Sequence, residues 1–304
     1  MNRIINYIKN IMKLNYRFFN IALCLIVVLS GCNNESNISE LPNFDNTNFE
    51  DRTYIVHLPK NYNANKPAPL MFAIHGIGID AAGTQQFSGF DQLGEDEGYI
   101  VVYPNSYDGF WSDGCNCQYV EQIGIDDVKF IDFLLEKMKK QYNIDTTRVY
   151  AWGWSQGGIL VNQLACRRAE VFAAFASYVG TMRLPVASAC YPKKPVNIVM
   201  FNGTDDKDVN WEGLPNTEFA FLAIPDLFKK WAGLSNCSGE PVSEMFPDSV
   251  DHIDVEKLTY ENCSGAKEVV LYKIIRGVHA LYRNKEIDTS EETIKFFNKH
   301  RLND

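Results

Sequence analysis

The stretch Val149-Tyr-Ala-Trp-Gly-Trp-Ser-Gln-Gly-Gly158 decides the fold that this sequence predicts. Residues 153–157 form the pattern G-x-S-x-G, with the apolar run VYAW directly before it and the helical pattern GILVNQLACRR directly after it. A serine on a sharp strand-to-helix turn needs glycines on both sides, because side chains there would collide where the backbone folds back. This context favours a nucleophile elbow with Ser155 as nucleophile over an ordinary serine in a tight glycine turn.

Working outward from the elbow, strand and helix patterns alternate along the chain. Continuous apolar runs predict buried parallel strands, at 70–74, 99–103, 149–153, 175–179 and 196–201. Further strands are expected at the β-rich run 53–58 and, late in the chain, at 267–275. Helical spacing of apolar residues predicts helices at 126–142, 155–167 and 217–234, and a capping box of Thr289 and Glu292 opens a last one. This alternation predicts a doubly wound α/β sheet, with an irregular insert at 235–265. Together with the elbow at Ser155, it predicts the α/β-hydrolase fold.

A serine at its normal pKa needs a base, and in such hydrolases the chain order is serine, acid, histidine. Three histidines follow Ser155. His300 lies in the terminal helix, where we expect it to be solvated, and His252 lies among acidic residues, where we expect it on the surface. His279 follows a strand and a glycine, at the sheet edge where these folds place their sites. We therefore predict His279 as the base.

The acid should follow the strand at 196–201. The segment Asn202-Gly-Thr-Asp-Asp-Lys-Asp208 offers Asp205, Asp206 and Asp208, and spacing alone does not choose among them.

An oxyanion hole needs two backbone donors. We predict the N–H of Gln156, directly after the nucleophile, and the N–H of Ile77 in the loop after the strand at 70–74. His75 comes too early in the chain to be the base, so its ring is expected to prop this loop.

The N-terminus has the layout of an export signal. The apolar run from Ile21 to Leu29 follows a basic stretch and is too short to span a bilayer comfortably. It ends in Leu29-Ser-Gly-Cys32, which resembles a bacterial lipobox and implies cleavage before Cys32 with a lipid on its sulfur. We predict a signal peptide at 1–31, a lipidated Cys32 with a polar tether over 32–50, and a folded domain at 51–304. The alternative is an uncleaved membrane anchor.

Composition limits the classes of partner. The chain has 304 residues, 46% hydrophobic and 22% charged, which is globular, and its formal charge is -9. The first 31 residues contain four basic residues and no acid, so the rest carries 25 basic against 38 acidic residues. A body this acidic repels phosphate backbones, so no nucleic-acid partner is expected.

The cysteines agree with export. Without Cys24 and Cys32, an even set of six remains, which indicates disulfides outside the cytoplasm. Sequence alone allows many pairings. The C-x-C at 115–117 has no histidine or further cysteine at ligand spacing beside it, so no zinc site is expected.

Six motifs together resemble the polyhydroxybutyrate-depolymerase and feruloyl-esterase group of secreted α/β-hydrolase esterases, from about Tyr54 to Phe297. They are AIHGIG, EGYIVVYPNS with Trp111, IDDVKFID, WGWSQGG, NGTDDKDVNW and GVHALY. The resemblance implies Ser155 as nucleophile, His279 as base and, two residues after the Gly-Thr pair, Asp206 as acid.

The resemblance also implies disulfides Cys237–Cys263 and Cys166–Cys190. The acyl pocket is expected to differ from that of the group, because three residues depart from the group's pattern. Asn202 stands where the group often has histidine, Leu281 where it usually has tryptophan, and Lys129 where it often has glycine. Trp111 and Trp211 are candidates for substrate binding at the wall of the pocket. The alternative is that both are aromatic residues of the hydrophobic core.

We therefore predict an exported, lipid-anchored serine esterase at the periplasmic or cell surface, which needs no metal or organic cofactor. Its expected substrates are feruloyl or acetyl esters of polysaccharide, or short polyesters. One alternative is a serine peptidase on the same fold, although no propeller or large lid segment is present. The other is a surface binding protein with a decayed hydrolase fold, which an intact Ser, Asp and His in order disfavours.

Overall fold

A computed structural model describes residues 49–217, 219–246, 254–283 and 287–303. The predicted signal peptide, the lipidated Cys32, nearly all of the tether and His252 lie outside these residues. The structure therefore bears on the folded domain alone.

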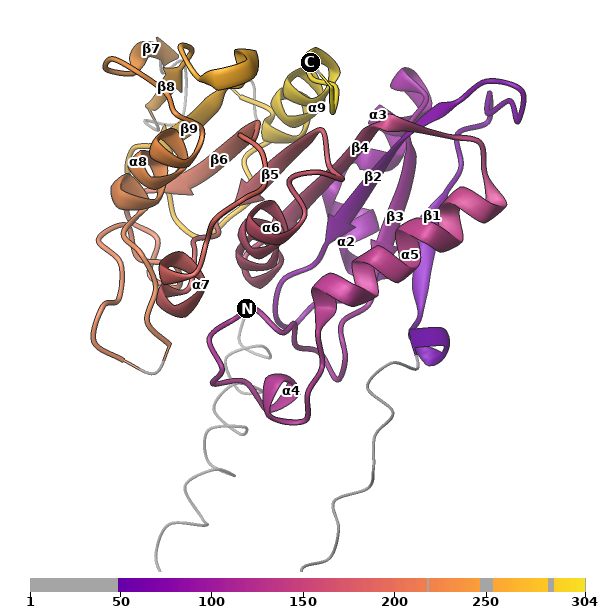
Figure 1. The fold of residues 1–304 in the computed structure, drawn as a ribbon, viewed down its shortest axis with the longest axis horizontal. Coiled ribbons are helices and arrows are strands. Elements are labelled where there is room, and N and C mark those ends of the chain that lie inside the picture. Colours follow the sequence, from indigo (N-terminus) through magenta and orange to yellow (C-terminus); the bar gives the residue numbers. More distant parts are fainter. Residues whose placement is uncertain (1–48, 218, 247–253, 284–286, 304) are drawn as a thin grey trace, which may run out of the picture. The chain divides into compact units, whose positions relative to one another are not determined.

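The described strands form one nine-stranded sheet in the order β1-β3-β2-β4-β5-β6-β9-β8-β7 (Figure 1). The strands are β1 (Tyr54–His57), β2 (Ala68–Ile74), β3 (Ile100–Pro104), β4 (Ile144–Trp154), β5 (Ala174–Tyr178), β6 (Ile198–Gly203), β7 (Val242–Phe246), β8 (Val255–Tyr260) and β9 (Val269–Ile274). Neighbours from β3 to β9 run parallel, whereas β1, β8 and β7 pair antiparallel at the two ends of the sheet. The parallel strands are the continuous apolar runs, because both of their faces are covered.

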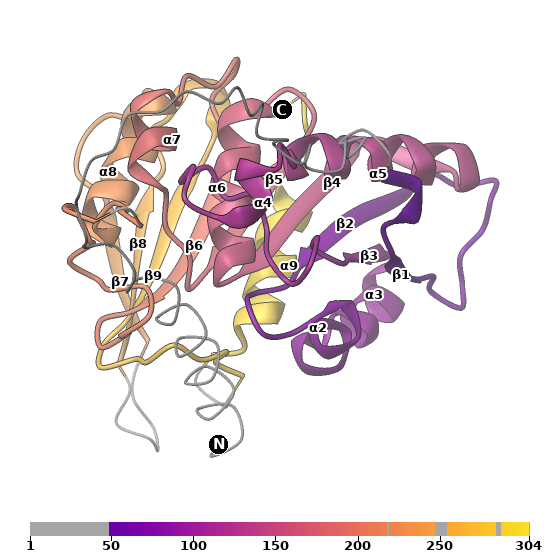
Figure 2. The ribbon, with the colours of Figure 1, turned by 90° about the horizontal axis from the view of Figure 1, so that it is seen from below.

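Helices cover both faces of the sheet (Figure 2). Along β2, Leu70 and Phe72 pack with α5 (Asp127–Gln141), α6 (Gln156–Arg167) and α8 (Ile224–Leu234). Met71 and Ala73, which point to the other face, pack with α2 (Ala81–Ser88), α3 (Phe90–Glu97) and α9 (Thr289–Lys299). The short helices α4 (Tyr119–Gln122) and α7 (Leu184–Ser188) lie in the connections. This arrangement confirms the doubly wound α/β prediction.

Three local expectations are wrong. The helix predicted from residue 217 begins only at Ile224, because Leu222 donates its N–H to the Met182 carbonyl and Phe221 pairs with Leu214 instead. Residues 235–265 are not an irregular insert, since β7 and β8 extend the sheet from β9.

The third wrong expectation concerns His300. It is buried rather than solvated, because its ring packs on Phe296 and its Nε2 lies 3.2 Å from a carboxylate oxygen of Glu268.

The structure contains the disulfides Cys115–Cys117, Cys166–Cys190 and Cys237–Cys263, of which the last two are the pairs that the resemblance implies. In the described ranges, none of the helices combines the length and the apolar character that crossing a bilayer would require.

Candidate active site

Ser155 occupies the turn between β4 and α6. Its backbone has φ 56° and ψ −119°, a conformation that costs energy for a residue other than glycine. The turn is held from both sides, because the Ser155 N–H donates to the Tyr178 carbonyl at 2.9 Å and its own carbonyl accepts from Ile159 N–H at 3.0 Å. Such a strained turn presents the hydroxyl at the end of the sheet.

The flanking glycines are required by close backbone approach. A Cβ on Gly157 would overlap the carbonyl of Ile74, and one on Gly153 would overlap the carbonyl of Gly157. The first turn of α6 therefore lies directly against the carboxyl end of β2.

Ser155, His279 and Asp206 form a continuous hydrogen-bonded chain. His279 Nε2 lies 2.9 Å from Ser155 Oγ, and His279 Nδ1 lies 2.7 Å from Asp206 Oδ2. His279 is on the loop after β9 and Asp206 on the loop after β6, so the pairing of β6 with β9 brings the two loops together. The sheet thus gathers three residues separated by up to 124 positions in the chain.

Of the three candidate aspartates, only Asp206 is buried, with 1% of its surface exposed. Its Oδ1 accepts the N–H groups of Asp208 and Val209, both at 2.9 Å. These donors orient the carboxylate so that Oδ2 accepts from His279 Nδ1–H. In that tautomer His279 Nε2 has a free lone pair for the serine proton.

The two predicted oxyanion donors belong to segments that adjoin Ser155. Gln156 is the first residue of α6, so its N–H has no acceptor within the helix. A Cβ on Gly76 would lie 2.9 Å from Ser155 Cβ, which places the loop bearing Ile77 against the nucleophile. Donation by both groups to a reaction intermediate stays a prediction.

His75 holds that loop and does not join the hydrogen-bonded chain. Its Nε2 accepts the Ser106 N–H at 3.0 Å, so Nδ1 carries the proton and donates to the Gly76 carbonyl at 2.8 Å. Burial lowers the pKa of His75, although the hydrogen bond to Gly76 opposes this effect. The ring is therefore neutral near pH 7.

The prediction that Trp111 lines the substrate pocket is wrong. Its side chain has no exposed surface and its Nε1–H donates to the His75 carbonyl at 2.8 Å, so it does not line an open pocket. Trp211 is half-buried against the core and keeps some accessible surface.

Two residues near the site were missed from the sequence. The Trp154 ring lies 5.5 Å from that of His279, and its place inside the G-x-S-x-G pattern was the available signal. The Tyr178 hydroxyl donates to the Ala280 carbonyl and accepts from Tyr282 N–H, which fixes the segment after His279. No sequence signal links Tyr178 to that segment.

Two clusters in the described ranges bring three potential metal ligands within 4.8 Å: Cys115, Cys117 and Glu121, and Asp206, Asp208 and His279. The first pair of sulfurs forms a disulfide, and only a thiolate binds a metal strongly. In the second, Asp206 and His279 already hydrogen-bond to each other.

Comparisons with known proteins identify relatives of this chain. Residues 85–189 match the model of the prolyl oligopeptidase family. The chain is 31% identical over 236 residues to feruloyl esterase D of Neurospora crassa, covering 74% of this chain and 73% of that protein. It is 28% identical over 240 residues to feruloyl esterase B of Piromyces equi, covering 75% of this chain but only 42% of that longer protein.

Among solved structures, acetyl xylan esterase from Aspergillus awamori superposes with a TM-score of 0.61 at 17% identity, covering 82% of this chain and 94% of that one. This likeness shows the α/β-hydrolase fold.

Proposed function

Because the chain belongs to the feruloyl esterase family, whose members are carboxylic ester hydrolases, we propose that it is a serine esterase with Ser155 as nucleophile. The observation that carries this proposal is the chain of hydrogen bonds of 2.9 and 2.7 Å from Ser155 through His279 to Asp206. Nucleophile, base and orienting acid thus lie at the separations that covalent catalysis uses.

The geometry supports a two-step reaction. As Ser155 Oγ attacks the ester carbonyl carbon, His279 Nε2 accepts its proton, and the Asp206 carboxylate stabilises the imidazolium. The carbonyl oxygen becomes an oxyanion, which the N–H groups of Gln156 and Ile77 would hold. His279 then donates the proton to the leaving alcohol. In the second step His279 takes a proton from water as the water oxygen attacks the acyl carbon, and it returns this proton to Ser155 Oγ when the acid leaves.

The proposed substrates are feruloyl or acetyl esters of polysaccharide, with short polyesters as a further class. The names of the two relatives support the feruloyl class, and exposed apolar side chains lie beside the site. Ile77 is 49% exposed and Val278, next to His279, is 54% exposed. They offer an apolar surface to an aromatic or short acyl group.

A serine peptidase is the second candidate, because residues 85–189 match the prolyl oligopeptidase family. That segment contains Ser155 but neither Asp206 nor His279. It supports the elbow rather than peptide specificity.

The test compares p-nitrophenyl acetate, methyl ferulate and a peptide p-nitroanilide with wild-type protein and Ser155→Ala. We expect hydrolysis of the esters, lost by roughly four orders of magnitude in Ser155→Ala because nucleophile and base act as a unit. Ser188→Ala, at an exposed serine on α7, is the matched control and should keep full activity. Faster cleavage of the anilide than of the esters would favour the peptidase.

We also propose that the protein is exported and held at a membrane by a lipid on Cys32. The three disulfides support an oxidising compartment. Incorporation of labelled fatty acid should be lost in Cys32→Ala, with the protein released from the membrane fraction. Unchanged labelling would exclude this anchor.

A further inference from the structure

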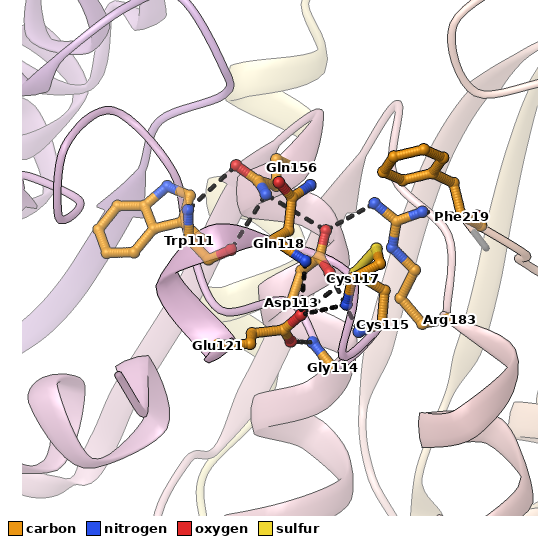
Figure 3. The surroundings of a disulfide bond; sticks show 10 residues. All are labelled: Trp111, Asp113, Gly114, Cys115, Cys117, Gln118, Glu121, Gln156, Arg183 and Phe219. Carbon is orange, nitrogen blue, oxygen red and sulfur yellow. Dashed lines mark hydrogen bonds and ion pairs between the residues drawn. A yellow bond between two sulfur atoms is a disulfide. The ribbon is translucent and has the colours of Figure 1, made fainter. Parts of the chain in front are cut away.

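One short segment, residues 111–113, contacts both sides of the proposed oxyanion hole. On the side of the Ile77 loop, the Trp111 indole N–H donates to the His75 carbonyl at 2.8 Å. On the side of α6, the Trp111 N–H donates to Gln156 Oε1 at 3.1 Å, and Gln156 Nε2 donates back to the Trp111 carbonyl at 3.0 Å (Figure 3). The Gln156 carboxamide therefore pairs with the backbone of Trp111 through two reciprocal hydrogen bonds.

A buried ion pair lies behind this carboxamide. Gln156 Nε2 is also 3.3 Å from Asp113 Oδ2, and the same oxygen accepts from Arg183 Nη2 at 2.7 Å. The Asp113 and Arg183 side chains are 0% and 7% exposed. Arg183 Nη1 further donates to the Phe219 carbonyl at 2.6 Å. Since burying two charges costs desolvation that the pair scarcely recovers, net stability is a weak reason for such a pair.

The loop that follows Asp113 is closed on itself. Cys115 and Cys117 form a disulfide, and Glu121 accepts the N–H groups of Gly114 at 2.6 Å and of Cys117 at 3.1 Å (Figure 3). On the other side, Ser112 donates its N–H to the buried Asp127 at 2.6 Å. The segment at 111–113 is thus fixed at Ser112, between its two contacts with Gln156, and again in the loop after Asp113.

We propose that the Gln156 side chain, Asp113 and Arg183 are positioning residues that hold the N–H of Gln156 at the oxyanion. This role rests on the proposed function. The N–H and the side chain of Gln156 share one Cα at the start of α6, so holding the carboxamide restrains the position of that Cα and of the N–H that donates to the intermediate. Oxyanion stabilisation depends on donors placed before the charge develops, and a misplacement of about 1 Å costs on the order of 100-fold in rate.

The test is Gln156→Met, which keeps the N–H and nearly the size of the side chain but loses its hydrogen bonds. We expect kcat on p-nitrophenyl acetate to fall roughly 10- to 100-fold, as a small displacement of a catalytic group does. KM should stay close to that of the wild type, because the lost interaction acts on the transition state. The acid limb of the pH–rate profile should not move, since His279 and Asp206 are untouched.

The matched control is Arg167→Met. Arg167 is the last residue of α6, where its two hydrogen bonds of 2.9 and 2.8 Å to Asp126 form a bidentate but partly exposed ion pair away from the nucleophile. This variant should lower thermal stability without lowering kcat.

A second variant, Arg183→Lys, keeps the buried positive charge but lacks the planar guanidinium group that donates two directed hydrogen bonds. It tests the proposal independently if the Gln156→Met protein does not fold. It should also lower kcat at unchanged KM, and it should slow labelling of Ser155 by a fluorophosphonate, whose phosphoryl oxygen needs the same donors. If the folded variants have the kcat of Arg167→Met, the positioning role is refuted. A wild-type protein that neither hydrolyses esters nor reacts with the fluorophosphonate would instead refute the proposed function, and this role with it.

Discussion

Replacing Asp206 with asparagine should remove most esterase activity while leaving the fold intact. Asp206 uses both oxygens, since Oδ1 accepts two backbone N–H groups and Oδ2 accepts from His279. Asparagine offers one oxygen and one NH₂ group. If the oxygen keeps the two backbone donors, the NH₂ group faces His279 Nδ1 and forces that nitrogen to accept.

The proton of the imidazole then resides on Nε2, which no longer has a lone pair for the Ser155 hydroxyl at 2.9 Å. The opposite amide orientation would set NH₂ against two N–H donors and lose both hydrogen bonds, so the first orientation is favoured. The corresponding change in a serine protease triad costs about 10⁴ in kcat. At about 1.36 kcal/mol per tenfold, this is roughly 5.4 kcal/mol of transition-state stabilisation.

The assay is steady-state hydrolysis of p-nitrophenyl acetate, with a thermal melt to show that each variant is folded. Asp205→Asn and Asp208→Asn are the controls, because both side chains are exposed. Asp208 needs particular care, since one of its oxygens lies within 4.8 Å of the Asp206 oxygen and the His279 nitrogen. The reasoning is refuted if Asp206→Asn keeps activity within tenfold of the wild type, or if Asp208→Asn is the more damaging change.

Three further predictions concern the scaffold. Replacing Cys237 and Cys263 by serine should lower the free energy of unfolding by about 3 kcal/mol on the chain-entropy model, measured by denaturant titration; an unchanged midpoint would contradict it. Burial alone would raise the pKa of Asp145, but hydrogen bonds from neighbouring side chains outweigh it and lower the pKa to about 2. The carboxylate therefore stabilises the fold fully above pH 3.8 and less as the pH falls towards 2, so Asp145→Asn should lower the melting temperature at pH 7 but scarcely near pH 2. Gly157→Ala should reduce both stability and activity, because its Cβ would overlap the Ile74 carbonyl; wild-type melting and turnover would show that this contact is not close.

The sequence predicts the central part of the sheet well because strands buried on both faces leave long apolar runs. It fails at β7, whose residues are almost all exposed, because an edge strand that is uncovered on both faces has no such run. It also misplaces His300, since the Glu268 partner lies 32 positions away and only the packed fold brings them together.

The residues of the active site also divide into those that local sequence identifies and those that only the fold brings together. The elbow is local, so the glycines and Ser155 identify it directly. The choice among three neighbouring aspartates depends on which one is buried against the loop after β9, and spacing carries no information about that. The placement of Trp111 failed for a related reason, because an aromatic residue near a motif can face the pocket or the backbone behind it. Asp113 and Arg183 are 70 positions apart, and nothing in the sequence indicates that they meet.

The Cys237–Cys263 bridge encloses β7, β8 and the residues that connect them in one covalent ring. A protease that cuts a single peptide bond inside this ring leaves the two fragments joined through sulfur. The fragment that begins after the cut contains β9 and His279, and it would still be held to the part of the chain that carries Ser155. A nicked molecule would therefore migrate as one species without reductant and as two with it.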